Sequence, residues 1–417
     1  MARSPDGISR RTYLRRLVAA GGVGALAACI DAPQARKVPT GTPDDRPASQ
    51  HAWSEALSTD AFGNDSAPEH HVLVALSLVG EPDTSETQQV ERAFRSLERA
   101  YAYDSAGLLF TVSYSPTYFE RTDAESPIPA PTTLTPLEGN IELDRFDALV
   151  HLASDDPAVV LEAEEALFGE VVRPNGVQMD ADLTGIFERA SPRRTGFVGE
   201  ELPAEMAANS GIDLPPQIPD EAPFFMGFRS GFRESQAPES RVTIEDGPFA
   251  GGTTTHVETL DINLRQWFTQ TDHDLRVAET FSPEHADAGL VDGTGTNLGD
   301  TTGVAGAIAD RTAEDARTRG VVGHAQKVAR ARDADGTPPL LRRDFNTLDG
   351  DSVGLHFLCH QRTVDDFVRV REAMAGEDLD GVGTRLNNGL LQYIFVRRRG
   401  NFLTPPRDQR SLPGVGN

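Results

Sequence analysis

The chain has 417 residues, of which 38 % are hydrophobic and 25 % are charged, so it is long enough to bury two cores of ordinary size. Its formal net charge of −25 argues against binding to nucleic acid, because the phosphate backbone is also negative. Lys37 and Lys327 are its only lysines, and an acidic chain with so few lysines indicates a salt-adapted host, in which carboxylates keep the surface hydrated. The alternative is an acidic face for a basic partner, but the acidic residues are spread along the chain.

Residues 1–28 are typical of a signal peptide. Arg10 and Arg11 form a twin-arginine motif, and the apolar run that follows, residues 17–28, is too short to span a bilayer. This run ends in a lipobox-like site, which predicts cleavage before Cys29 and lipidation of its thiol. We therefore expect export by the twin-arginine pathway and a lipid anchor on the outer face of the cell membrane. The alternative is an ordinary cleaved leader with an incidental cysteine.

The segment after this site, residues 29–67, is rich in Pro, Asp, Ser and Thr. Such a composition predicts a disordered tether that holds the folded part away from the membrane. If Cys29 is lipidated, Cys359 is the one remaining thiol and no internal disulfide can form.

The first folded part, residues 68–200, follows a β-α-β-β-α-β order. Strands are expected at residues 71–78, 108–112, 146–152 and 196–198. One helix is indicated by apolar residues at helical spacing between Val90 and Tyr101, and another by Asp156 and Pro157, which suit a cap and a first turn. This order is typical of a ferredoxin-like domain.

The second part, residues 201–406, repeats the order less clearly. Strands are expected at residues 254–264, 354–359 and 390–396, with a helix after the cap-like Thr363. A polar, Gly-rich stretch fills residues 283–320, and residues 407–417 suggest a loose tail. The sequence thus predicts an α+β protein of two ferredoxin-like domains with antiparallel sheets.

The chain contains ten histidines but none of the common catalytic motifs. HExxH, CxxC, GxSxG and GxxxxGK[ST] are all missing from the sequence, which argues against a zincin, a redox dithiol, an α/β-hydrolase and a P-loop enzyme. His356 and His360 fall on one face of an expected strand, as two metal ligands would, but no third ligand is evident. His324 lies between the polar stretch and residues 340–345, and a histidine in such a place is more often structural than functional.

Several short segments, taken in order, resemble the dye-decolourising (DyP-type) peroxidase family over residues 70–406. The segments and the family patterns they resemble are 107–116 (GLxxTxGxGP), 146–157 (DLLxxIxADDP), 225–231 (GFxDG), 251–267 (GGS…MDLxxW), 340–345 (LRRGY) and 354–361 (GLLFxCYQ). Each piece is short, and the specificity of the match comes from their order and spacing.

The resemblance implies two ferredoxin-like domains with haem b in the second. His324 matches the proximal haem ligand of the family, and Arg342, eighteen residues later, matches its distal arginine. Gly227 and Gly231 belong to the segment that matches the distal motif, which implies contact with the cofactor. The implied partners are hydrogen peroxide and an unknown electron donor. A homo-oligomer is an open alternative, since ferredoxin-like sheets often pair.

The chain departs from the family pattern at Ser230, which stands where the family has a distal aspartate. A serine does not act as a general base at neutral pH without an activating partner, so the resemblance implies a slow peroxidase in which Arg342 aligns peroxide through a water held by Ser230. Residues 283–320 also lack the GRxKxxGxPL run of the family. Two alternatives remain: a non-catalytic haem-binding or iron-handling lipoprotein, and a haem-free relative of the same fold.

Overall fold

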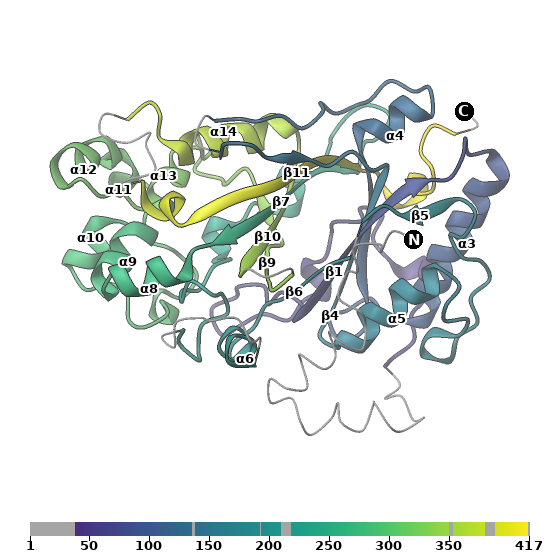
Figure 1. The fold of residues 1–417 in the computed structure, drawn as a ribbon, viewed down its shortest axis with the longest axis horizontal. Coiled ribbons are helices and arrows are strands. Elements are labelled where there is room, and N and C mark those ends of the chain that lie inside the picture. Colours follow the sequence, from purple (N-terminus) through teal and green to yellow (C-terminus); the bar gives the residue numbers. More distant parts are fainter. Residues whose placement is uncertain are drawn as a thin grey trace, which may run out of the picture.

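The computed structural model describes residues 38–135, 138–191, 193–209, 218–349, 353–379 and 388–415. Its centre is a closed sheet of eight strands (Figure 1). In spatial order these are β2 (Leu109–Tyr114), β4 (Ala148–Ser154), β1 (His70–Leu78), β6 (Arg194–Phe197), β9 (Phe345–Thr347), β10 (Gly354–Gln361), β7 (Thr253–Ile262) and β11 (Ile394–Thr404). Shorter strands pair at its margins: β3 (Glu142–Leu143), β5 (Phe187–Arg189) and β8 (Leu341–Arg342).

Helices α3 (Thr84–Ala100) and α5 (Pro157–Leu167) cover the strands of the first half. The Asp83 side chain caps α3 in a capping box with Glu86, and Asp156 caps α5, so both helices begin where their polar residues satisfy free backbone N–H groups. Apolar residues of β1 alternate between the two faces of the sheet. Val72 packs under these helices and Leu73 packs inside the closed sheet, which explains why this strand is apolar throughout.

The second half adds a group of helices at the end of the molecule opposite α3 and α5 (Figure 1). They are α8 (Leu264–Gln270), α9 (His273–Thr280), α10 (Pro283–Asp287), α11 (Ala307–Asp310), α12 (Thr312–Arg319), α13 (His324–Ala329) and α14 (Val364–Ala375). The polar, Gly-rich stretch at residues 283–320 therefore contains three short helices. Their few buried apolar side chains were too sparse to give a helical pattern in the sequence.

The α+β class and the antiparallel pairing are confirmed, but the two halves do not form separate sheets. Phe197 of β6 pairs with Asn346 of β9, and Leu403 of β11 pairs with Tyr114 of β2, which joins the strands of both halves into one closed sheet. The division into two ferredoxin-like domains at residue 200 stays a prediction.

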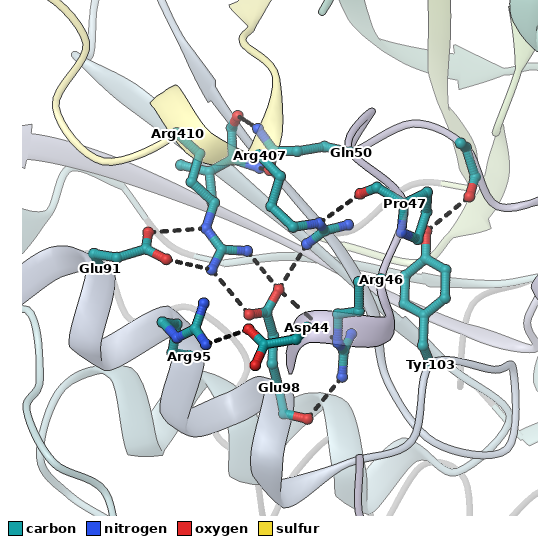
Figure 2. Close-up of polar contacts among 12 residues, drawn as sticks. Asp44, Arg46, Pro47, Gln50, Glu91, Arg95, Glu98, Tyr103, Arg407 and Arg410 are labelled. Carbon is teal, nitrogen blue, oxygen red and sulfur yellow. Dashed lines mark hydrogen bonds and ion pairs between the residues drawn. The ribbon is translucent and has the colours of Figure 1, made fainter. Parts of the chain in front are cut away.

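Both ends of the described chain are packed against the fold, so the expected tether and loose tail are corrected in part. Trp53 is fully buried, and the Gln50 side chain bonds to Val112 of β2 and to the carbonyl of Pro405. Figure 2 shows Glu98 of α3 receiving hydrogen bonds from Arg407 and Arg410 of the tail, at 2.7 and 2.5 Å. Composition alone does not reveal such anchoring, because it depends on a few buried side chains and not on average polarity.

The predictions about the signal peptide concern residues that precede the described part of the chain. Arg10, Arg11, Cys29 and the tether up to residue 37 lie outside the described residues. Within the part of the chain that the structure describes, no helix has the length and apolar character needed to cross a membrane.

Candidate active site

A cavity of about 250 Å³ lies between the outer face of β7 and β10 and the helices α13 and α14. Its walls are mostly apolar, with phenylalanines, leucines and valines from many separate segments. The apolar lining includes Phe228, Phe232, Val304, Val328, Leu340, Phe357, Leu391 and Ile394. A largely apolar cavity with a few polar side chains is the common form of a cofactor or substrate site.

His324 is the one histidine among the described residues that line this cavity. Burial, and then the positive charges of Lys327 and Arg342, lower its pKa to about 3, so the imidazole is neutral at physiological pH. Among the described residues, none forms a hydrogen bond with its buried Nδ1. A neutral imidazole without a protein partner at this nitrogen is available for a metal.

The backbone that carries His324 is fixed by close packing. A Cβ added to Gly323 would lie 1.7 Å from the carbonyl oxygen of Phe281, so a glycine is required where α13 approaches the end of α9. The side chain of Gln326 accepts a hydrogen bond from the Gly323 N–H at 3.2 Å, which holds the first turn of α13. These contacts position His324 on the cavity wall.

Ser230 and Arg342 also line the cavity, and they bond to each other. Arg342 Nη1 donates to Ser230 Oγ at 3.1 Å, and its Nη2 donates to Ser235 Oγ at 3.4 Å. Arg342 lies on β8, which pairs with β10 at Cys359. The structure thus brings together the three residues that the sequence analysis placed around one cofactor: His324, Arg342 and Ser230.

Gly227 and Gly231 lie in the segment that carries Ser230 but are not among the residues that line the cavity. Both adopt positive φ angles, 89° and 80°, and so allow the turns that precede and follow Ser230. Among the described residues that line the cavity, neither glycine is present. They shape the segment that carries Ser230, while the contacts with the cavity come from its side chains, such as Phe228.

Several charged residues on or beside the cavity were missed by sequence reasoning, and four of them have contacts that bear on the site. Glu258 and Arg371 line it as parts of a buried ionic cluster, in which Arg371 bonds to Glu138 at 3.0 Å. Lys327 donates to the Asn388 carbonyl at 3.0 Å, and burial lowers its pKa to about 7. No motif in the sequence marks these three residues.

The fourth, Asp344, lines the cavity two residues after Arg342. Its Oδ1 is buried, and no described residue forms a hydrogen bond with it. A signal was present here, because Asp344 occupies the position of the glycine in the LRRGY pattern.

The other histidines that were considered do not themselves line the cavity. His256 stacks on Phe367 at 3.5 Å between ring centroids and bonds through Nδ1 to Asn401 at 2.7 Å. His356 and His360 are buried on β10. Within the described ranges, no group of three or more His, Cys, Asp or Glu side chains is placed to hold a metal ion.

The chain matches one family model and is similar in fold to several solved structures. A model described as a family of unknown function (DUF7405) matches residues 68–406. No curated protein matches the chain. A dye-decolorizing peroxidase from Bacteroides thetaiotaomicron has a TM-score of 0.56 at 14 % identity, covering 86 % of this chain and 98 % of its own. Ferric DtpA from Streptomyces lividans has a TM-score of 0.54 at 19 % identity, covering 85 % and 95 %.

A variant of DypB from Rhodococcus jostii, solved in complex with heme, has a TM-score of 0.53 at 13 % identity and covers 88 % of this chain and 99 % of its own. The similarity to the DyP-type fold that short sequence segments indicated is therefore confirmed over most of the chain.

Proposed function

We propose that this chain, which belongs to the family of unknown function DUF7405, is a haem-dependent peroxidase that reduces hydrogen peroxide with electrons from an unidentified donor. One observation carries the proposal: His324, Arg342 and Ser230 line one largely apolar cavity in a fold shared with DyP-type peroxidases. The heme complex of the DypB variant supports haem as the cofactor.

The residues around the cavity fit haem b. The macrocycle is flat and apolar, which suits a lining of phenylalanine and leucine side chains. Its two propionates are anionic, and the guanidinium groups of Arg229, Arg332 and Arg371 on the lining are candidates to receive them. His324 would supply a neutral imidazole to hold the haem iron.

Bound haem would supply the redox-active iron that exchanges electrons between peroxide and the donor. His324 would hold that iron. Arg342 lies on the lining with its guanidinium beside Ser230, where its charge stabilises the negative charge that develops on a peroxide oxygen. Ser230 Oγ accepts a hydrogen bond from Arg342, so its own hydroxyl hydrogen is available to a peroxide or a water. It does not provide a base.

A second function is favoured by this lack of a base at position 230. General acid–base help is worth about 10²–10⁴-fold in rate, and a site without it suits a protein that binds haem for storage or delivery. A non-catalytic haem-binding or iron-handling lipoprotein of the same fold is therefore the alternative.

The visible spectrum and a turnover assay separate these functions. Protein loaded with haem should show a Soret band and should oxidise a dye only when hydrogen peroxide is present. A Soret band without dye oxidation would favour the haem-handling function. If no Soret band forms, both functions are wrong and the chain is a haem-free relative of the fold.

The proposal also includes location. Arg10 and Arg11 support export by the twin-arginine pathway, and Cys29 supports a lipid anchor on the outer face of the cell membrane. A pathway that carries folded cargo suits a protein that binds its cofactor before export.

A further inference from the structure

We propose that Asp344 is the residue that takes up and returns the proton during peroxide reduction, and that it replaces the carboxylate missing at position 230. This inference rests on the proposed haem peroxidase function. It gives the site the proton acceptor that Ser230 does not provide.

The backbone around Asp344 is held on both sides by the sheet. Arg342 pairs with Cys359 of β10, and Phe345 pairs with His356 of the same strand. Between them, the Arg343 N–H donates to the Leu358 carbonyl at 2.7 Å. Asp344 is therefore carried by a rigid segment, as a residue that must keep its place in a site requires.

The alternation of side chains in this segment directs Asp344 to the cavity. Arg343 is buried, with its guanidinium carbon 5.6 Å from the Trp53 ring centre, and Phe345 packs in the interior of the closed sheet. Arg342 and Asp344 alternate with these two residues, so their side chains point to the opposite side, and both line the cavity.

One oxygen of the Asp344 carboxyl group lacks a hydrogen-bond partner in the described part of the chain. Its Oδ1 is buried, and no described residue forms a hydrogen bond with it. Buried polar atoms in native proteins are almost always bonded, and an exception needs a reason. A peroxide or water hydroxyl in the cavity would supply the missing hydrogen bond.

The charges near Asp344 suit a proton carrier. Burial raises the pKa of the Asp344 carboxyl, while the positive charge of Arg342, a hydrogen bond with the backbone of Asp344 itself and the positive charge of Arg343 oppose this rise. From β10, Cys359 lies close enough for the charge of Asp344 to raise the pKa of its thiol further, after the effect of burial. The carboxylate thus has cations nearby and still an increased tendency to accept a proton.

The proton balance can be written in full. Asp344 takes the proton from one oxygen of hydrogen peroxide and gives it to the other oxygen, which leaves as water when the O–O bond breaks. Arg342 stabilises the charge on the leaving oxygen. The remaining oxygen becomes the second water with two protons from solvent and two electrons that come finally from the donor. Asp344 ends deprotonated, as it began, and transfers no electrons.

The test compares haem-loaded wild type with Asp344→Asn, and uses two readouts after the Soret band has shown equal haem content. The first is the rate of reaction with hydrogen peroxide. The second is the rate of hydrogen cyanide binding, which needs removal of a proton but no turnover. Asp344→Asn should slow both by about 10²-fold or more. Asp335→Asn is the matched control, because Asp335 is exposed and outside the cavity lining, and it should react as the wild type does.

Two further variants test whether a carboxylate is what the reaction requires, and the first also serves if Asp344→Asn folds poorly. Asp344→Glu retains a carboxylate and should keep most of the cyanide-binding rate. The double variant Ser230→Asp, Asp344→Asn should react with hydrogen peroxide at least tenfold faster than Asp344→Asn alone, because it returns a carboxylate beside Arg342. Unchanged rates in haem-loaded Asp344→Asn would overturn the inference and leave the proposed function intact. Absence of a Soret band in the wild type would overturn the proposed function, and this inference with it.

Discussion

Arg342 Nη1 donates a hydrogen bond to Ser230 Oγ across 3.1 Å, although 112 residues separate the two along the chain. The same guanidinium reaches Ser235 Oγ, and the backbone N–H of Arg342 donates to Gln236 at 2.9 Å. The loop that carries Ser230 is thus tied to β8 through several bonds. The position that matches a distal acid therefore faces the arginine that would act with it.

Replacement of Arg342 tests this arrangement. Arg342→Leu removes the donor to Ser230 and the positive charge on the cavity wall, so the reaction of the haem-loaded protein with peroxide should slow by about 10²–10³-fold. Stopped-flow absorbance of the Soret band measures this rate. Arg397→Leu is the control, because Arg397 is exposed and pairs with Asp261. Equal rates in the two variants would show that Arg342 does not act on peroxide.

Gly323 provides a test of how His324 is positioned. A Cβ at this residue would lie 1.7 Å from the Phe281 carbonyl oxygen, so Gly323→Ala should displace the start of α13 and destabilise the protein by about 1–3 kcal/mol. The affinity for haem should also fall, as measured by titration of haem into the haem-free protein. Gly336→Ala is a control for the loss of a loop glycine, since a Cβ there meets no atom within 4 Å, although its positive φ adds some strain of its own. An affinity equal to that of the wild type would mean that α13 does not depend on this contact.

The ionic cluster in Figure 2 predicts a dependence of stability on pH. Burial alone would raise the pKa of Glu98, but the hydrogen bond and charge of Arg410, then the charge of Arg407, outweigh burial and lower it. The folded-state pKa is below the ordinary value of 4.5, so this stabilisation is complete above pH 4.5 and is lost as the pH falls through the lowered pKa.

Glu98→Gln should therefore reduce the free energy of unfolding by about 3–5 kcal/mol at neutral pH, because it removes the carboxylate partner of the buried Arg46 and Arg407, whereas Arg410 keeps its bonds to Glu91. Urea unfolding at several pH values measures the effect, and the loss should shrink at acid pH. Asp44→Asn is the matched control, because Asp44 forms an exposed pair with Arg95 at 2.6 Å that contributes about 0–1 kcal/mol. A loss for Glu98→Gln no larger than for Asp44→Asn would contradict the role of the cluster.

Export and anchoring are tested in the cell. Changing Arg10 and Arg11 together to Lys should leave precursor inside the cell, and Cys29→Ser should release the mature protein from the membrane fraction. Fractionation followed by immunoblotting shows both outcomes. Membrane attachment of the Cys29→Ser protein equal to that of the wild type would exclude the lipid anchor.

The sequence was informative where local pattern and motif spacing determine structure. The strand at β1 and the helices α3 and α5 follow from apolar periodicity and caps, and His324, Arg342 and Ser230 were found together because their segments keep a known spacing. The strand and the helices depend on neighbouring residues in the chain, and the three site residues were reached through motifs that resemble a known family.

Other features depend on contacts between distant residues. The closure of the sheet rests on pairings such as Leu403 with Tyr114, and the packing of the tail rests on Arg410 reaching Glu98, neither of which has a local pattern. Asp344 was missed for another reason. Its departure from LRRGY was visible, but only the structure shows that its side chain lines the same cavity as His324.

The central claim is that His324 holds haem iron, and a haem titration of wild type and His324→Ala tests it most directly. The wild type should bind one haem with the Soret band of an iron–imidazole complex. His324→Ala should lose that spectrum and bind haem more weakly, whereas the control His273→Ala, from outside the cavity lining, should match the wild type. If His324→Ala instead kept full haem content and an unchanged spectrum, the ligand would lie elsewhere, with His256 the next residue to test, and this account of the site would be wrong.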